Sequence, residues 1–343
     1  MTNKFAQCLF ALLIAIGLVF TTSIACAQTV TGSIRGTVTD ASGAVVTDAR
    51  VVAKNVSTGV STTTVTDRSG SYNLQSLPIG TYVVSAEKSG FKITAERPFA
   101  LEIDQIARID LQLQVGDVTT TVEVAQDAGA ILQTEDASLG TTVTSNTLES
   151  MPLGGQNFSA ATVFVPGAVL PTYGSLGSTQ GTERDTSFAS STQPSFNGNR
   201  MQTNNYIFDG TDINEPLQNT IAYNPAPEAT EEMRVITGNA SAEYGNVNGG
   251  EVLVVTKAGS NQFHGSLYTF YENQDGTANT WSNKYNGIAK GVFHQNQFGA
   301  TVGGPVFKNK LFFFADYLGF RETSAGTQVI SVPTARMVKG DFS

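Results

Sequence analysis

The sequence predicts a mainly β protein with three folded units behind an N-terminal leader. Glycine is abundant, with 34 residues in 343, while charged residues make up only 14 % of the chain. Apolar and polar residues alternate in short runs between turn-forming residues, and period two is typical of half-buried strands. Late in the chain such runs lengthen to about ten residues, the length of a tilted strand that crosses a bilayer. We therefore expect a soluble β part followed by membrane-type strands.

The first 27 residues have the pattern of a cleaved secretory signal peptide. Lys4 supplies the basic start, and residues 9–20 form an apolar stretch too short to span a bilayer as a helix. Ala25 and Ala27 frame a small-residue cleavage site, so we expect cleavage after Ala27. Cys26 leaves a lipoprotein alternative open.

The two cysteines, Cys8 and Cys26, both lie in this leader. After cleavage the mature chain would contain no cysteine, which excludes disulfides, thiolate zinc sites and cysteine nucleophiles. The two histidines, His264 and His294, are thirty residues apart and favour surface positions over a metal site.

Residues 28–115 form the first unit, in which acidic and basic residues balance at eight each. Strand-like runs recur about every ten residues with turn signals between them, which predicts a β-sandwich of six or seven strands. Two sets of alternating residues should form its core: Ile109, Leu111 and Leu113, and Tyr82, Val84 and Ala86.

Six stretches of this unit stand in a specific order: 36–43, 49–51, Asn55 with 58–59, 70–72, 77–82 and 90–91. With their turn glycines and strand aromatics they resemble the carboxypeptidase regulatory-like domain. The resemblance implies a transthyretin-like, carbohydrate-binding-like fold in an accessory domain without peptidase activity. It leaves open a carbohydrate ligand of this domain.

Residues 116–258 form an acidic second unit, with sixteen acidic against four basic residues. This balance argues against nucleic acid as a partner. A Ser/Gly/Thr-rich stretch, 173–195, is predicted to be an exposed loop.

Residues 259–343 carry fifteen of the 31 aromatic residues. Three strand candidates stand out, 263–272, 296–306 and 311–320. In the second, one face holds Phe298, Ala300, Val302, Gly304 and Val306, and the other holds Gln297, Gly299, Thr301 and Gly303. This alternation is typical of a barrel strand with an apolar lipid face and a polar lumen face. A long polar connection around 273–291 and a tight turn at 308–310 fit the long outer loops and short periplasmic turns of such barrels.

Further stretches of the second and third units occur in an ordered set: 148–158, 165–167, 196–200, 204–206, 208–212, 242–245, 249–250, 254–261, 263–266, 296–299, 303–305, 310–314, 332–334 and 340–343. Together they resemble TonB-dependent outer-membrane receptors, and more narrowly their Oar-like branch. The resemblance implies an α+β plug inside a barrel of about 22 strands, surrounded by outer-membrane lipid. It also implies a TonB-type energy-transducing partner in the periplasm, where the first unit would lie.

By the same resemblance, a short TonB box should separate the first unit from the plug. The candidate is the β-prone run Val118, Thr119, Thr120, Thr121, Val122, Glu123, Val124 and Ala125. Such a run can be captured by β-augmentation on the edge of a partner's sheet. The alternative is that it is only a linker or the first plug strand.

The motif residues expected in the plug are Asn197, Gly198, Arg200, Asp209, Gly210, Glu243 and Gly245. For Asp209 to Asp212 a calcium site and a turn are both open, and the turn is favoured because Asp-Gly is a common turn pair. Arg200 and Asp209 are candidates for a buried salt bridge.

No catalytic set emerges, because the sequence has neither a nucleophile elbow nor a phosphate-binding loop. The adjacent acids Glu231 and Glu232 would point to opposite faces of a strand, which does not suit acid–base work. We therefore expect neither an enzyme nor a cofactor.

Three strands cannot close a barrel, and an open edge in lipid leaves backbone groups unsatisfied. We therefore expect this chain to be the N-terminal piece of a longer receptor that passes an unidentified bulky solute, a saccharide or an oligopeptide. The alternative is a surface or secreted module that binds carbohydrate or mediates adhesion, with a plug that does not transport.

Overall fold

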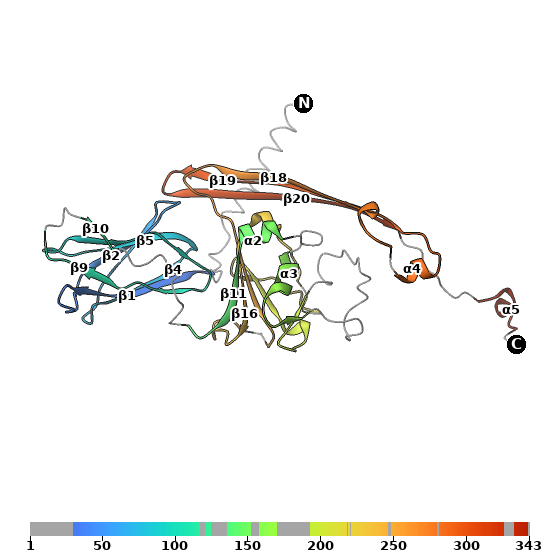
Figure 1. Ribbon diagram of the computed structural model, residues 1–343, viewed down its shortest axis with the longest axis horizontal. Coiled ribbons are helices and arrows are strands. Elements are labelled where there is room, and N and C mark those ends of the chain that lie inside the picture. Colours follow the sequence, from blue (N-terminus) through green and yellow to red (C-terminus); the bar gives the residue numbers. More distant parts are fainter. Residues whose placement is uncertain are drawn as a thin grey trace, which may run out of the picture.

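The structure, a computed structural model, describes residues 30–116, 121–124, 136–151, 158–169, 193–217, 219, 221–245, 248–279, 281–325 and 333–341. The leader with Ala25 and Ala27, residues 118–120 and 125 of the TonB-box candidate, and most of the loop 173–195 lie outside the described residues. Figure 1 shows three parts: a β-sandwich, an α+β central domain beside it, and a long three-stranded sheet that lies over both. The mainly β fold class is confirmed.

The sandwich contains nine strands, to which a tenth is added from the following segment. They are β1 (Gly32–Asp40), β2 (Arg50–Asn55), β3 (Ser61–Val65), β4 (Ser71–Leu77), β5 (Gly80–Glu87), β6 (Ile93–Glu96), β7 (Phe99–Leu101), β8 (Ile106–Arg108), β9 (Leu111–Leu113) and β10 (Thr121–Val124). One sheet has the order β4-β1-β8, with β9 also on β1, and the other has the order β10-β6-β5-β2-β3, with β7 on β5. The expected six or seven strands were too few, because β6 to β9 have only three or four residues and are too short to show a period.

The core of the sandwich lies between its two sheets. Both predicted sets are buried in it: Ile109, Leu111 and Leu113, and Tyr82, Val84 and Ala86. Tyr72 also enters the core, where its hydroxyl donates a hydrogen bond of 2.6 Å to the carbonyl oxygen of Ile109. This bond satisfies a polar group that would otherwise be costly to bury.

The central domain is a five-stranded sheet with short helices on one face. Its elements are β11 (Leu139–Thr144), α2 (Ser145–Ser150), α3 (Phe158–Ala161), η2 (Thr162–Phe164), β12 (Ala168–Val169), β13 (Ser195–Phe196), η3 (Met201–Thr203), β14 (Asn205–Phe208), β15 (Thr211–Asp212), η4 (Pro227–Ala229), β16 (Thr230–Gly238) and β17 (Glu251–Thr256). The main sheet has the order β11-β16-β17-β14-β15.

The two faces of this sheet have different partners. Met233 and Val235 of β16 point to the helix side, where they share a core with Leu148 of α2 and Phe158 of α3. On the opposite face, Ile207 of β14, Ile236 of β16 and Leu253 of β17 form a smaller cluster with Ile103 of the sandwich. Both faces are therefore covered, which explains why β17 is an almost continuous apolar run.

The third part comprises β18 (His264–Asn273), η5 (Gln274–Gly276), α4 (Trp281–Tyr285), β19 (Val292–Phe307), β20 (Leu311–Ala325) and α5 (Ala335–Val338). Strands β18 to β20 form one antiparallel sheet. The predicted strands are present, but β19 has 16 residues and β20 has 15 where about ten were expected. Both continue because Val292 still pairs with Ala325, and a continued ladder keeps satisfying backbone groups beyond the apolar segment.

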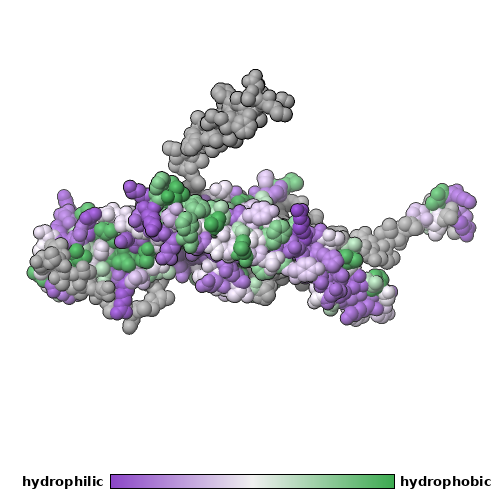
Figure 2. All heavy atoms as spheres, turned by 90° about the horizontal axis from the view of Figure 1, so that it is seen from above, coloured by the Kyte–Doolittle hydropathy of each residue, from purple (hydrophilic) through white to green (hydrophobic). Residues whose placement is uncertain are grey.

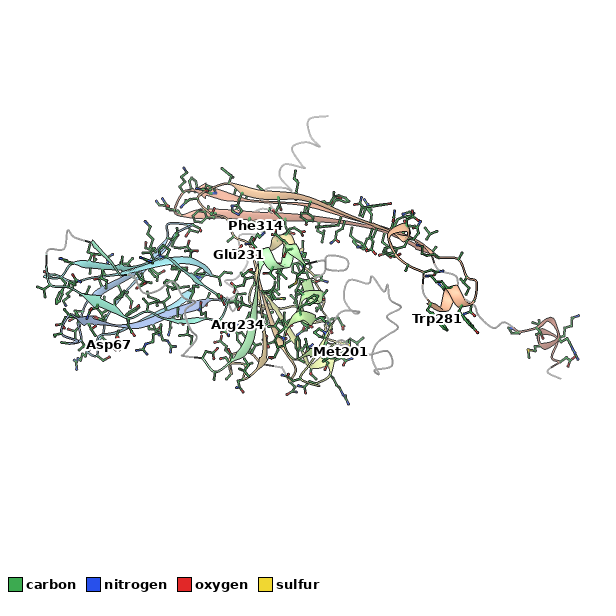
Figure 3. All side chains as sticks on the ribbon, in the orientation of Figure 1. Asp67, Met201, Glu231, Arg234, Trp281 and Phe314 are labelled. Carbon is green, nitrogen blue, oxygen red and sulfur yellow. The ribbon has the colours of Figure 1, made fainter. Side chains whose placement is uncertain are left out.

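The faces of this sheet agree with the predicted alternation. Gln297 and Thr301 are buried on the inner face, whereas Val302 is exposed on the outer face. Leu267 and Tyr317 are exposed on that outer face too, and Figure 2 shows apolar residues scattered over this side of the molecule. Figure 3 places Phe314 on the side that faces the central domain. None of the helices in the described ranges is long and apolar enough to cross a membrane.

Gly36 gives a test of the sandwich packing. A methyl group there would overlap the carbonyl oxygen of Ile109 and press on the Tyr72 ring. We expect Gly36→Ala to lower the free energy of unfolding by about 1–3 kcal/mol, as overpacking of a filled core does. Urea unfolding followed by circular dichroism measures it. The control is Gly245→Ala, whose added methyl meets nothing within 4 Å; equal unfolding midpoints for Gly36→Ala and wild type would contradict the close approach.

Candidate coupling site between the three parts

The sandwich contacts the central domain through the turn between β7 and β8. Ile103 at its tip is fully buried and packs with Ile207, Ile236 and Leu253 of the five-stranded sheet. The next residue, Asp104, has a φ of 55°, which tightens the turn so that the Ile103 side chain can project. An apolar anchor in a pocket of the partner surface is typical of a specific interface.

Two charged residues of β16 hold the backbone of this anchor. Arg234 Nη1 donates to the Ile103 carbonyl oxygen at 3.0 Å, and the Ile103 amide donates to Glu232 Oε1 at 3.3 Å. Arg234 also forms an ion pair with Asp136 at 3.7 Å and donates to Ser138 Oγ at 3.0 Å. In Figure 3 Arg234 lies on the side of the central domain that faces the sandwich. The turn is thus fixed by polar and apolar contacts together.

Buried carboxyl groups make this interface sensitive to pH. Burial raises the pKa of Glu232 to about 7. On the same face of the sheet, burial raises the pKa of Glu251 to about 8, against a hydrogen bond of 3.1 Å from Asn205 Nδ2. Burial also raises the pKa of Asp104, whose carboxylate accepts a 3.2 Å hydrogen bond from the Tyr244 hydroxyl. Near neutral pH the interface therefore changes its charge.

A second contact joins the sandwich to the three-stranded sheet. Asn261 Nδ2 donates to the Thr58 carbonyl oxygen at 2.7 Å and to Asn309 Oδ1 at 2.8 Å. The Asn309 amide donates back to Asn261 Oδ1 at 2.9 Å. Asn309 lies in the β19–β20 turn with a φ of 61°. The sandwich therefore sits at the short-turn end of the sheet, away from the long connection that contains α4 (Figure 1).

A cavity of about 410 Å³ opens where all three parts meet. Its walls include Ile79 of the sandwich, Val255 of the central domain and His264 of β18. The three parts are therefore in contact around a hollow junction and do not form one continuous core.

The described part of the TonB-box candidate lies on the sandwich. Strand β10 pairs in parallel with β6, with Thr121 opposite Ile93 and Val124 opposite Glu96. The structure thus makes Thr121–Val124 an edge strand of the six-stranded sheet. It belongs neither to the central sheet nor to a free linker.

The other predicted residues are mainly turn formers. Asn197 and Gly198 have φ values of 51° and 80°, and Asn197 Nδ2 donates to the Thr237 carbonyl oxygen at 2.7 Å. Asp209 and Gly210, with φ values of 46° and 80°, form the turn between β14 and β15. The turn favoured for this pair is therefore observed.

The salt bridge expected between Arg200 and Asp209 is not formed. Arg200 is exposed, and the Asp209 carboxylate instead accepts hydrogen bonds from the Thr256 amide at 2.9 Å and the Thr256 hydroxyl at 2.8 Å. The physical reason is that an aspartate in a turn beside the end of a strand lies within hydrogen-bonding distance of donors on that strand, here those of Thr256.

Glu243 and Gly245 are exposed, and the residue between them makes the contact that the sequence analysis overlooked. Tyr244 reaches Asp104 across the interface. Arg234 and Glu251 were overlooked too, although each is a charged residue within or at the start of an apolar strand. Such a position is the signal that could have identified them. Glu231 and Glu232 do point to opposite faces, as expected: the first is exposed and the second is buried.

A separate hollow of about 550 Å³ in the sandwich is lined by residues of β1, β4 and β8 of one sheet and of β3 of the other. Arg35 lies in its lining, with Asn73 of β4 and Arg108 of β8 as its register partners. Arg35 Nε is buried and has no hydrogen-bond partner in the described part of the chain. Arg108 is paired with Asp110 at 3.1 Å.

The described chain thus combines a small sandwich, an α+β domain and an amphipathic antiparallel sheet whose polar face covers that domain. Comparisons with known proteins match the first and the last of these parts to known domains. Residues 33–114 match the carboxypeptidase regulatory-like domain, and residues 255–343 match an outer membrane beta barrel domain. These matches support an outer-membrane location.

The chain is homologous to the TonB-dependent transporter Oar of Myxococcus xanthus, with 28 % identity over 274 residues. The match covers 74 % of this chain but 23 % of that protein, so the chain spans about a quarter of its relative's length.

Solved structures resemble the chain only in part. A suspected carbohydrate-binding protein of Bacteroides uniformis has 19 % identity and a TM-score of 0.21, over 24 % of this chain and 40 % of that one. Catechol 1,2-dioxygenase of an Acinetobacter species has 13 % identity and a TM-score of 0.23, over 32 % and 60 %.

The raised pKa of Glu232 predicts a pH-dependent interface. The protonated acid is favoured when buried, so its stabilising effect is complete below about pH 4.5 and is lost as the pH rises through about 7. The neutral variant Glu232→Gln should therefore match the wild type at pH 4 and exceed its free energy of unfolding at pH 8, by up to about 3 kcal/mol. Urea titrations at several pH values measure this difference. Glu231→Gln, at an exposed residue, should show no such trend. A difference between Glu232→Gln and wild type that does not change with pH would refute the assignment.

Proposed function

We propose that this chain is the N-terminal part of a TonB-dependent outer-membrane transporter that passes an unidentified bulky solute, a saccharide or an oligopeptide. In this proposal the central domain is the plug and β18 to β20 begin the barrel. The sandwich and β10 lie in the periplasm after export with a cleaved signal peptide. The chain has no catalytic role.

One observation carries this proposal most directly. The polar face of the three-stranded sheet lies over the central domain and its apolar face is exposed, as required of barrel strands that surround a plug in lipid. The sandwich at the short-turn end fits a periplasmic position, because such barrels have short periplasmic turns. The homology to a TonB-dependent transporter supports the same proposal.

Strand β10 is the part that a TonB-type protein would bind. It lies between the sandwich and the central domain in the chain, it is extended, and it stands at the edge of a sheet. These are the requirements for β-augmentation, in which the partner adds a strand through backbone hydrogen bonds.

Proline in β10 tests this assignment. Val122→Pro removes a backbone donor and disfavours pairing, so the full chain in detergent should bind the C-terminal domain of a TonB protein at least about tenfold more weakly. Biolayer interferometry measures the affinity. Val122→Thr keeps the strand propensity and should bind as the wild type does. If Val122→Pro binds equally well, β10 is not the TonB box.

A second function is supported by the hollow around Arg35: the sandwich binds a saccharide that carries a carboxylate. Hydroxyl and amide groups of Thr37, Thr64 and Asn73 line the same hollow and suit sugar hydroxyls. The Arg35 guanidinium, whose Nε has no hydrogen-bond partner among the described residues, suits a carboxylate, which it can bind with two hydrogen bonds.

Binding of uronate oligosaccharides tests this second function. Arg35→Gln should weaken binding to oligogalacturonate by about tenfold or more, because a hydrogen bond to a charged group is worth roughly 1.5–3 kcal/mol. Isothermal titration calorimetry with neutral cello-oligosaccharides as comparison ligands measures the preference. Arg68→Gln removes an exposed charge outside the hollow and is the control. Equal affinity of wild type and Arg35→Gln would exclude the site.

A further inference from the structure

The TonB-box candidate is already part of a sheet, and this determines how a partner can reach it. Strand β10 is the last strand in the order β10-β6-β5-β2-β3. All four of its residues are in register with β6. In the described part of the chain no strand pairs with its other side. One side of β10 is therefore hydrogen-bonded to β6, and the other side pairs with no strand in the described part of the chain.

The open side can accept a strand without loss of the existing pairing. In any strand, the backbone groups of successive residues point alternately to its two sides. The hydrogen bonds that β10 makes to β6 thus leave the groups of the alternate residues available. An exposed sheet edge of this kind is a ready template for another chain.

Pairing with β6 also lowers the cost of capture. A free peptide must be fixed in an extended conformation when it binds, at roughly 1–2 kcal/mol per residue. On β6, the residues Thr121–Val124 are extended beforehand. Preorganisation of this kind increases affinity because the ordering has already taken place.

We propose, on the basis of the function proposed above, that the sandwich is a platform that presents β10 to TonB. The TonB-type protein adds its edge strand to the open side of β10 while β10 stays paired with β6. The surface that TonB recognises is then the edge of a six-stranded sheet and not a free peptide.

An engineered disulfide tests whether β10 stays on β6 during capture. Glu123 and Ala95 are register partners, and neighbouring strands place Cα atoms within the range that a disulfide spans. The two natural cysteines, Cys8 and Cys26, are replaced by serine so that Glu123→Cys and Ala95→Cys form the one disulfide. Binding of the TonB C-terminal domain to the full chain in detergent is then measured in the oxidised and reduced states.

We expect the oxidised chain to bind TonB at least as tightly as the reduced chain. A loss of tenfold or more on oxidation, reversed by reductant, would show that TonB and β6 use the same side of β10, and it would overturn the platform while leaving the TonB box in place. Absence of binding in both states, with wild-type chain also failing to bind, would overturn the proposed function itself. Each single cysteine variant serves as a control for the substitutions.

A peptide gives the complementary measurement. A synthetic peptide of residues 117–126 contains the candidate strand without the sandwich, and it should bind TonB at least about tenfold more weakly than the full chain does. Equal affinity of peptide and chain would show that β6 contributes nothing, and the platform would be excluded.

Discussion

The hydrogen bonds that Arg234 and Glu232 make with the backbone of Ile103 are the constraint on which the arrangement of the parts depends. Arg234 is almost fully buried in a strand whose alternate residues form the core of the central domain. Its guanidinium satisfies a backbone carbonyl of the sandwich and an acid of the segment that leads into β11. A buried ion pair is weak support for stability in itself, but loss of one partner is costly because the other charge is then left uncompensated. The sandwich is therefore held at one place and in one orientation.

That orientation has a mechanical consequence under the proposed function. Four residues separate Gly116 from Thr121, whereas eleven separate Val124 from Asp136. Fully extended, the first connection reaches about 17 Å and the second about 40 Å, at up to about 3.5 Å per residue. A pull on β10 would therefore fully extend the connection to the sandwich before the connection to the central domain. The first interface to carry load would be the Ile103 turn, together with the contact between Thr58 and Asn261.

Much of this architecture could be predicted from the sequence, because it depends on local patterns. The alternation in β19 identified its two faces, and the short and long connections identified its ends. The core of the sandwich followed from period two in β5 and β9. The remainder depends on contacts that no local pattern encodes. The three- and four-residue strands exist because neighbours pair with them, and the extra length of β19 and β20 reflects their mutual ladder.

The candidate site was predicted less well for the same reason. Turn residues such as Asp209 were found because Asp-Gly has an intrinsic preference. Arg234, Tyr244 and Glu232 act across an interface, and their partners are more than a hundred residues away. The sequence does show that each is a charged or hydroxyl-bearing residue in or beside an apolar strand. This position indicates that the side chain is buried, but it does not identify the residue that it contacts.

The β-prone run at Thr121–Val124 has the same limit. Its extended conformation follows from composition, whereas its place on β6 follows from the open edge that the sandwich would otherwise expose. An unpaired edge strand is a liability. Under the proposed platform, β10 covers the edge of β6 and presents its own open side as the surface that TonB recognises.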